Sequence, residues 1–498
     1  MKKCIVIGGG LGGLVTGALL AKENYKVTVL EKNAIIGGGL QSFKRHGASF
    51  PTGMHIFGGF EADGNMRKLF NYLGILDKIS IRPTDETVSD VVTFASDGTR
   101  YQLPKGKENF IQYLSALFPA ETEGIKAYVE KLFALSQEEA LFYLRENDAS
   151  GLDHSDDFLM PYDELIDRYI HNAKLKALLC YLNPLFDGVR GVTPAYIHAL
   201  LSVLHINGTW QFEGDSLQMA QALAQVIEDA GGQVIADEEV TKIEVSNHQV
   251  TQVVTKKGNV YKSNYYISDV HLDVLLRIID ENAFTSAFRK RIGQVPETSS
   301  CFKVFVKFKK EAFPFMNHAN FCFEDYTYGL NAKETAMAQW PRDLMFVTPP
   351  TQNQGAFADT MVILSPMPFD WVREWEHTSS GRRGDAYAQW KQRMTEQVLD
   401  RMESLCPGFR DKTECVFAAS PLTIRDFYGN KEGSCYGFSK DSHQLMLSQL
   451  AVKTKIGNLL LTGQNVNLHG LCGVSLTAIE TAEALVGRNV IVRKINNP

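Results

Sequence analysis

Three glycines near the start of the chain have the spacing that binds a dinucleotide. Gly8, Gly10 and Gly13 form the pattern G-x-G-x-x-G, and Glu31 follows about twenty residues later. In this pattern Gly8 permits a tight turn, Gly10 lets the backbone approach a pyrophosphate, and Gly13 lets a helix pack closely on a strand. The helix N-terminus directs free N–H groups and its positive dipole end toward the pyrophosphate. An acid at the position of Glu31 accepts hydrogen bonds from a ribose.

The residues around these glycines predict the β-α-β unit that must position them. Residues 4–7 form a short apolar run, residues 11–24 are suited to a helix, and residues 26–30 form a second buried strand that leads into Glu31. The first 21 residues superficially resemble a secretory signal, but cleavage there would destroy this unit. We therefore interpret them as part of the folded protein. No other stretch reaches the roughly 18–20 apolar residues of a membrane span.

More glycines follow the ribose acid and recur near the C-terminus. Residues 37–42 read Gly-Gly-Gly-Leu-Gln-Ser, and residues 52–55 read Thr-Gly-Met-His. Residues 457–464 form an apolar strand that ends in Thr-Gly-Gln, and residues 470–474 begin a helix that ends near residue 486. Between these regions, residues 216–230 have the apolar spacing of an amphipathic helix, and a predicted strand begins near Val240.

Together these segments resemble the large FAD-binding family that includes amine oxidases and phytoene desaturases. The resemblance implies an α/β fold in which a Rossmann-like FAD-binding domain is joined to a discontinuous substrate domain of mixed α+β structure. None of the cysteines or histidines lies in a recognisable flavin-attachment motif, so we expect noncovalent FAD. The glycine pattern and the resemblance assign the cofactor to Gly8, Gly10, Leu11, Gly12, Gly13, Glu31, Lys32, Gly38, Gly39, Met54, His55, Val240, Gly463, Gln464, Gly473 and Val474.

Three positions depart from the family pattern. Gly39 stands where an arginine is usual, Gln464 replaces an acid, and Pro51 replaces an aspartate. Without the arginine, affinity for the phosphates must depend more on backbone amides and the helix dipole. Gln464 can still hydrogen-bond a hydroxyl, without charge.

Other motifs narrow the resemblance to one branch of the family. Residues 52–58 are similar to the T-G-x-H-Y-x-G stretch of retinol saturases. Residues 420–423 and 433–437 resemble the T-P-x-T and G-S-x-Y-G stretches of phytoene desaturases, carotenoid isomerases and retinol saturases. Residues 462–464 resemble the T-G-Q of the saturase group.

This branch implies redox chemistry on a carbon–carbon bond of a hydrophobic polyene, isoprenoid or lipid. We favour a retinol saturase-like reductase, in which flavin supplies a hydride and the protein positions the double bond. Three alternatives stay open: a carotenoid-type desaturase or redox-neutral isomerase, a flavin amine oxidase, and a non-catalytic FAD-binding protein. A saturase also needs a proton for the second carbon. The candidate donors are His55 and His469, followed by Tyr436.

Composition limits the partners of the protein. The net charge is −6, which gives no field that favours nucleic acid. The eight cysteines include no C-x-x-C pair, which argues against a zinc site, a thioredoxin-like dithiol and the disulfide-reductase branch of flavoproteins. A reducing compartment is expected. We predict a cytoplasmic protein with no bound metal, which contacts a membrane at most peripherally. Only one dinucleotide motif is visible, so electrons are expected from NAD(P)H directly or from a separate redox protein. No pattern predicts the oligomeric state.

The predicted domains interrupt one another along the chain. Residues 1–70, 210–290 and 430–498 are expected to form the FAD-binding domain. Residues 71–209 are expected to form a helical insertion, and residues 291–429 a substrate domain with a second sheet, which includes strands at 301–308 and 361–364. We expect a deep apolar tunnel that ends at the flavin, walled by residues 162–204 and the second sheet.

Overall fold

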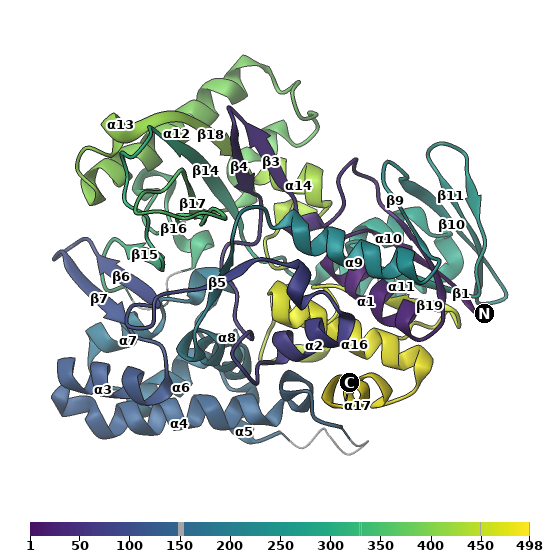
Figure 1. Ribbon diagram of the computed structural model, residues 1–498, viewed down its shortest axis with the longest axis horizontal. Coiled ribbons are helices and arrows are strands. Elements are labelled where there is room, and N and C mark those ends of the chain that lie inside the picture. The colour runs from purple at the N-terminus through teal and green to yellow at the C-terminus, as the bar shows by residue number, and fades with distance from the viewer. Residues whose placement is uncertain (148–153, 328, 330, 449, 498) are drawn as a thin grey trace.

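A parallel five-stranded sheet forms the nucleotide-binding half of the protein (Figure 1). The computed structural model describes residues 1–147, 154–327, 329, 331–448 and 450–497. In these residues the strand order is β19-β13-β1-β2-β9, and every pairing is parallel. The strands are β1 (Lys3–Ile7), β2 (Lys26–Leu30), β9 (Gln233–Ile235), β13 (Tyr265–Ser268) and β19 (Leu459–Leu461). The sheet therefore draws on three separate stretches of the chain.

Three helices pack against this sheet, and their apolar residues are buried in the core. Helix α1 (Leu11–Lys22) packs on both α9 (Leu217–Asp229) and α16 (Gly470–Val486). An antiparallel three-stranded sheet lies beside them, formed by β10 (Val240–Ser246), β11 (Gln249–Thr255) and β12 (Val260–Tyr261). The β-α-β unit, the amphipathic helix near residues 216–230 and the C-terminal strand and helix are thereby confirmed.

A mixed seven-stranded sheet forms the other half of the molecule. Its order over the described residues is β18-β14-β17-β16-β15-β6-β7, antiparallel except where β15 pairs with β6. The strands are β6 (Asp90–Phe94), β7 (Thr99–Leu103), β14 (Ser300–Phe308), β15 (Ala319–Phe323), β16 (Leu344–Val347), β17 (Thr360–Met367) and β18 (Thr413–Ala419). The predicted strands at 301–308 and 361–364 correspond to β14 and β17. Both faces of β14 are buried: Phe302 and Val304 pack in one core cluster, and Phe305 packs in another.

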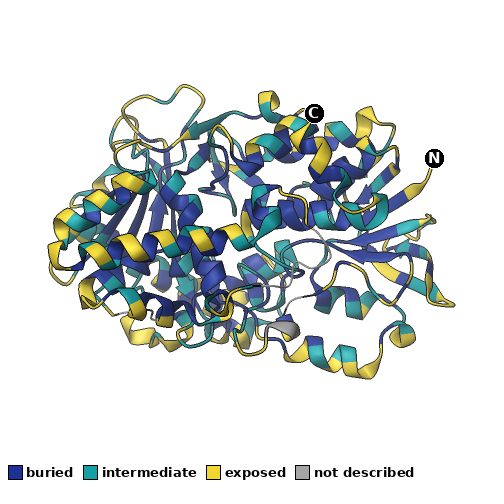
Figure 2. Ribbon diagram, turned by 90° about the horizontal axis from the view of Figure 1, so that it is seen from below, coloured by how far each residue is buried: buried dark blue, intermediate teal, exposed yellow. Residues whose placement is uncertain are grey.

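The two faces of the larger sheet are covered differently. Helix α12 (Gly384–Leu405) packs on one face through Trp390, Met394 and Val398. A layer of helices lies toward the other side, and its exposed residues lie mainly on the outer surface (Figures 1 and 2). It includes α3 (Lys107–Leu117), α4 (Thr122–Glu138), α5 (Asp156–Leu159), α6 (Tyr162–Tyr169), α7 (Ala173–Leu179) and α8 (Ala195–Asn207). No helix among the described residues is both long and apolar enough to cross a membrane.

The segment 71–209 is less purely helical than expected. It contributes β5 (Ile81–Pro83), which pairs with β8 (Trp210–Phe212), and it contributes β6 and β7 to the large sheet. Residues 100–103 alternate between exposed and buried side chains, and residues 95–98 form the turn that joins the two strands. This hairpin had a local sequence signal that the expectation of an all-helical insertion overlooked.

The smaller elements complete the layers. Strands β3 (Ser42–Arg45) and β4 (Ala48–Pro51) form a hairpin beside the seven-stranded sheet. The remaining helices are α2 (Asn65–Leu73), α10 (Leu272–Ile278), α11 (Ser286–Gln294), α13 (Phe409–Lys412), α14 (Pro421–Tyr428), α15 (Leu445–Ser448) and α17 (Val490–Asn496).

Candidate functional site

The first glycine loop joins β1 to α1 in a geometry that requires glycine. Gly8 has a φ of +104°, a conformation that side chains disfavour. A Cβ at Gly13 would lie 2.2 Å from the carbonyl oxygen of Gly8, so only glycine lets the helix come this close to the loop. Helix α1 begins directly after Gly10, with no side-chain cap. Its first N–H groups are thus available at the end of the sheet.

Glu31 follows β2 and is held at the same end of the sheet. One of its carboxylate oxygens, Oε2, accepts a hydrogen bond of 2.7 Å from the N–H of Gly9. The other, Oε1, accepts one of 2.8 Å from the N–H of Asn33. These bonds fix the orientation of the carboxylate in the wall of the adjoining cavity. Each oxygen has a second lone pair, so the group retains capacity for a ligand hydroxyl.

Asp269 is a functional candidate that the sequence analysis did not single out. It follows β13, and burial raises its pKa to about 7, although a hydrogen bond from the Gly13 N–H acts to lower the pKa. The nearby charge of Glu31 raises the pKa further, and the Gly10 N–H opposes the rise. The carboxyl group therefore lies against the glycine loop, where it shares the Gly10 N–H with the pyrophosphate site that the motif predicts.

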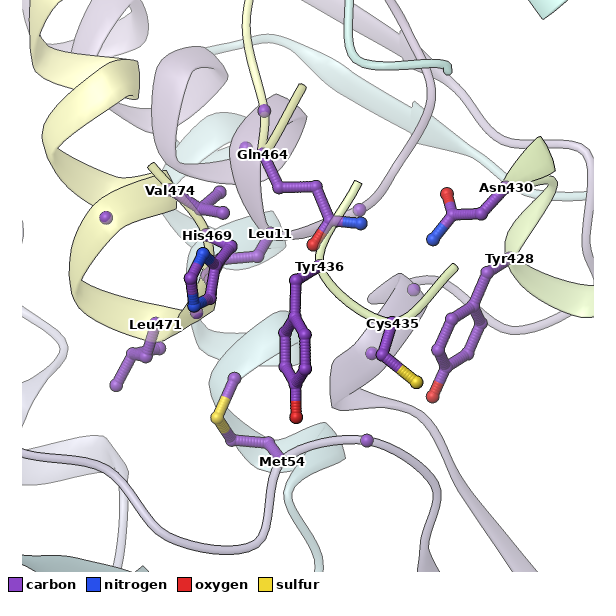
Figure 3. A pocket seen from close by; sticks show the side chains of 18 of the residues that line it. Leu11, Met54, Tyr428, Asn430, Cys435, Tyr436, Gln464, His469, Leu471 and Val474 are labelled. Carbon is purple, nitrogen blue, oxygen red and sulfur yellow. The ribbon is translucent and has the colours of Figure 1, made fainter. Parts of the chain in front are cut away.

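One cavity of about 410 Å³ connects the predicted cofactor residues with the second half of the molecule. Every predicted cofactor residue except Gly13 lines it, as does His469. Gly13 instead lies behind the loop, where its role is close packing. Figure 3 shows Leu11, Met54, Gln464 and Val474 around the same space.

The shape of this cavity fits an extended dinucleotide. No atom lies within 4 Å of a Cβ placed on Gly39, so the space that a side chain would fill is open. Gly463 has a φ of +91°, and a Cβ at Gly473 would lie 2.5 Å from Leu468 Cβ. Glycine at 473 therefore lets the first turn of α16 form part of the cavity wall. The N-termini of α1 and α16 both meet the cavity, which suits a ligand with negative charge at two places.

Both candidate catalytic histidines line the cavity, but neither carries a charge near neutral pH. Burial lowers the pKa of His55 to about 3, and the positive charge of Lys303 adds to the effect. Both ring nitrogens of His55 are buried without a hydrogen-bond partner among the described residues. Burial likewise lowers the pKa of His469 to about 4. Its Nε2–H donates to the carbonyl of Leu185 at 3.1 Å, and its ring lies 4.9 Å from that of Tyr436.

Lys303 is a buried charged group of the cavity wall that the sequence analysis missed. It lies on β14, is 5% exposed, and donates a 2.5 Å hydrogen bond from Nζ to the carbonyl of Thr52. Burial favours the neutral amine, but Tyr428, Cys301 and Cys435 outweigh it and raise the pKa. The signal available in the sequence was a lysine between buried apolar residues of a predicted strand.

A second missed group lies farther along the cavity. His205 on α8 lines the cavity and donates from Nδ1 to Asp90 on β6 at 2.8 Å. Tyr181 donates to the same carboxylate oxygen at 3.0 Å. Among the described residues the Nε2 of His205 has no hydrogen-bond partner, so the ring offers one polar atom to its surroundings. Within the described ranges, no cluster of His, Cys, Asp and Glu is arranged to hold a metal ion.

The chain is similar to flavoproteins over nearly its full length. It is 27% identical to all-trans-retinol 13,14-reductase of Macaca fascicularis, covering 98% of this chain and 86% of that protein. It is 23% identical to 4,4'-diaponeurosporene oxygenase of Staphylococcus aureus (strain MW2), covering 99% and 100%. The solved structure of putrescine oxidase bound to putrescine has a TM-score of 0.65 at 12% identity, covering 97% and 99%, and shows a shared fold.

These similarities confirm the resemblance read from the motifs and the predicted α/β fold. The family model described as flavin containing amine oxidoreductase matches residues 11–486. Flavin is the cofactor of that family, and the cavity between β1, α1 and α16 has the glycines and helix N-termini to receive it. The chain belongs to the flavin containing amine oxidoreductase family and is an FAD-dependent oxidoreductase.

Proposed function

We propose that this protein binds FAD noncovalently and adds hydrogen to a carbon–carbon double bond of an elongated apolar polyene or isoprenoid. The observation that carries the proposal is an apolar arm of the cavity, continuous with the cofactor residues. Four residues of α8 supply one side: Ile197, Leu200, Leu201 and Leu204. Met345 of β16 and Leu364 of β17 also line it. These walls come from α8 and the second sheet, which supports the proposed substrate tunnel.

Burial in this arm favours long hydrocarbons. Removing apolar surface from water contributes about 25 cal/mol per Å², so affinity should grow with the length of ligand buried. The relatives described above include a retinol reductase and a diaponeurosporene oxygenase, which supports an isoprenoid substrate. Desaturation or isomerisation of such a substrate would use the same cavity, and the direction of electron flow is part of the test.

His205 gives the apolar arm one polar contact. The bond between Nδ1 and Asp90 orients the ring and leaves Nε2 as its second polar atom. A ligand hydroxyl within reach of Nε2 would hydrogen-bond to it and set the register of the chain along the cavity. We therefore extend the proposal to substrates that carry one hydroxyl group at the end of the hydrocarbon.

The cofactor residues are assigned as follows. The N–H groups at Gly10, Leu11 and Gly12 would hold the pyrophosphate, and Glu31 would accept from the adenosine ribose. Backbone groups at Val240 would contact the adenine, and Gln464 would hydrogen-bond the ribitol. The first turn of α16, at Gly473 and Val474, would stabilise negative charge on the flavin pyrimidine. When bound, FAD supplies the hydride chemistry.

A reductase also needs a proton for the second carbon, and Lys303 is the best-placed source. His55 and His469 are neutral at pH 7 because their pKa values are lowered to about 3 and about 4. Burial raises the pKa of Tyr436 well above its usual value, and its hydroxyl already donates to the carbonyl of Pro184 at 3.0 Å. Lys303 remains an ammonium in the cavity wall. Donation by either histidine stays a prediction that these pKa values disfavour.

The charge of the wall also argues against amine oxidation. An alkylammonium substrate would meet the buried cation of Lys303. The acids that line the described cavity are Glu31, Glu239 and Asp269, all in the dinucleotide-binding part of the chain. An amine thus has no carboxylate partner in the apolar arm.

The proposal is tested with photoreduced holoprotein under anaerobic conditions. Polyene alcohols of increasing chain length are incubated with it, and product masses are measured against the same ligands with heat-denatured protein. A product that is heavier than its ligand by two hydrogens supports the reductase, and the amount of this product should increase with the chain length of the ligand. If oxidised holoprotein instead removes two hydrogens from the ligand, the protein is a desaturase. A product of unchanged mass but altered double-bond geometry would establish an isomerase. Release of hydrogen peroxide from amines would establish an amine oxidase. Electron supply by NAD(P)H or a redox protein stays a prediction, which is tested by measuring oxidation of each donor. A peripheral membrane contact stays a prediction too, which is tested by vesicle sedimentation.

A further inference from the structure

Two cysteines that are far apart in the sequence meet in the wall of the cofactor cavity. Cys301 lies on β14, and Cys435 lies just after the short 3-10 helix Lys431–Gly433. Their sulfur atoms are 3.4 Å apart although the residues are separated by 134 positions. Cys301 is buried and Cys435 is half-buried. The other six cysteines form no such contact among the described residues.

This cysteine pair separates two cavities. Cys301 and Cys435 line the large cavity and also a second, smaller one of about 60 Å³. The wall of the smaller cavity includes half-buried residues, among them Thr335 and Arg342. Figure 3 shows Cys435 in the cofactor cavity with Tyr428 and Tyr436 on either side of it. The pair is thus in contact with the cofactor cavity and with a second cavity whose wall includes residues that are partly exposed to solvent.

The surroundings favour the reactive form of one sulfur. The Cys435 thiol donates a hydrogen bond to the Cys301 sulfur, which lowers the pKa of Cys301 despite its burial. Lys303 lies two residues farther along β14, and its positive charge lowers this pKa further. A thiolate is the form of cysteine that attacks a disulfide or transfers electrons. Two thiols in contact, beside a fixed cation, have the arrangement of a redox couple.

We propose that Cys301 and Cys435 are a redox-active dithiol that passes two electrons from an external low-molecular-weight dithiol to the flavin. In the outward step, both S–H bonds break and one S–S bond forms. Two electrons and one proton pass to the oxidised flavin, and the second proton leaves to solvent. In the return step the external dithiol, approaching through the smaller cavity, reduces the protein disulfide by thiol–disulfide exchange and becomes a disulfide itself. The cycle consumes one external dithiol for each flavin reduced.

This inference does not depend on the substrate of the enzyme. It concerns how electrons reach the flavin, and a failed search for a polyene product would leave it standing. It also differs from a C-x-x-C arrangement, because the fold and not the local sequence brings the two sulfurs together.

The first experiment asks whether the disulfide forms. Holoprotein is oxidised with oxidised lipoamide, denatured in iodoacetamide and digested, and its peptides are analysed by mass spectrometry. A peptide containing Cys301 joined to one containing Cys435 is expected, and it should disappear after reduction. Separate alkylation of both cysteines after this treatment would overturn the proposal.

The second experiment asks whether the pair exchanges electrons with the flavin. Oxidised wild-type holoprotein, titrated anaerobically with dithionite, should take up two more electrons per flavin than C301S or C435S. Dithiothreitol should bleach the flavin absorbance about tenfold or more faster in wild type than in either variant. C415S, which removes a cysteine of β18 outside the pair, should behave as wild type.

Two separate single variants are used so that misfolding of one variant does not decide the result. Retained flavin absorbance shows that a variant is folded, and either serine alone breaks the pair. Equal electron uptake, or equal bleaching rates, in wild type and a flavin-loaded C301S or C435S would refute electron transfer through the dithiol.

Discussion

The Nδ1–H of His205 on α8 donates a 2.8 Å hydrogen bond to Asp90 on β6. The two residues are almost completely buried, and Tyr181 donates to the same carboxylate oxygen. This bond fixes the tautomer of the imidazole and the rotation of its ring. The bond joins a helix and a strand of different layers. Because His205 also lines the cavity, the bond orients a polar atom within an otherwise apolar arm.

His205→Leu should reduce affinity for polyene alcohols and leave affinity for the matching hydrocarbons unchanged. One hydrogen bond contributes about 0.5–1.5 kcal/mol net, so the dissociation constant of the alcohol should rise by roughly twofold to tenfold. Binding is measured by the change in flavin absorbance on titration. Equal losses for alcohol and hydrocarbon would show that the substitution disturbs packing and does not remove a specific contact.

FAD affinity should depend on pH through Asp269. Its pKa is raised to about 7 in the folded protein, from the ordinary value of 3.8, so the carboxyl group is neutral below pH 7 and charged above it. Charge at this position opposes a pyrophosphate on the same N–H groups, so FAD should bind more weakly as pH rises through 7. Asp269→Asn should remove this dependence. The check is to measure the dissociation constant of FAD by fluorescence over about three pH units around the raised pKa, from about pH 5.5 to about pH 8.5.

The same raised pKa affects the stability of the protein without FAD. Between pH 3.8 and about 7 the unfolded chain releases this proton while the folded chain keeps it. The contribution of the protonated Asp269 carboxyl group to the free energy of unfolding is therefore fully present below pH 3.8 and is lost as pH rises through about 7. Asp269→Asn should flatten this part of the stability profile, and a parallel profile for both proteins in denaturant melts would contradict the assignment.

Glu31→Ala should weaken FAD binding by about tenfold or more, because charge-assisted bonds of this kind contribute roughly 1.5–3 kcal/mol. The structure adds a second cause: the N–H of Gly9 loses its acceptor, and the glycine loop is held less firmly. Glu239→Ala is the matched control, since Glu239 also lines the cavity but is only half-buried and forms an ion pair with Lys256. Equilibrium dialysis should give a larger loss for Glu31 than for Glu239, and equal losses would remove Glu31 from its assigned role.

Gly39→Arg should tighten FAD binding. The Cβ position is open, Gly39 is absent from the positive-φ glycines, and an arginine would supply the phosphate charge that the family pattern usually has there. We expect a fall of about tenfold in the dissociation constant. Gly38→Arg is the control, because Gly38 has a φ of +55° and its Cβ would meet Gly10 Cα at 3.2 Å. A weaker complex from Gly39→Arg would show that the space is needed by the cofactor itself.

Segments whose function depends on local chain order were predictable from the sequence. The glycine loop, Glu31 and the start of α16 follow fixed offsets from a strand, and the structure places them around one cavity. The pairs Cys301–Cys435 and His205–Asp90 were not predictable in this way. Their members are separated by 134 and 115 residues, and packing between layers brings them together. Burial likewise decides that His55 is neutral, and a single sequence does not specify burial.

Lys303→Met should slow the protonation step of the proposed reduction. Methionine preserves the length and apolar stem of the side chain but removes the ammonium from the cavity wall. General acid catalysis contributes about 10²–10⁴-fold, so the rate of product formation from photoreduced holoprotein should fall by at least about 10²-fold. The KM for the polyene should change little, because the ammonium is not needed to bind a hydrocarbon.

Lys303→Arg separates charge from proton transfer. A guanidinium keeps the positive charge but does not release its proton in proteins. If Lys303 is the proton donor, the arginine variant should be about as slow as the methionine variant and should incorporate less solvent deuterium into the product per unit time. If the arginine variant keeps the wild-type rate, the positive charge alone is sufficient, and the proton comes from another group. Flavin absorbance of each purified variant shows that the cavity is intact, so a low rate reports on chemistry and not on cofactor loss.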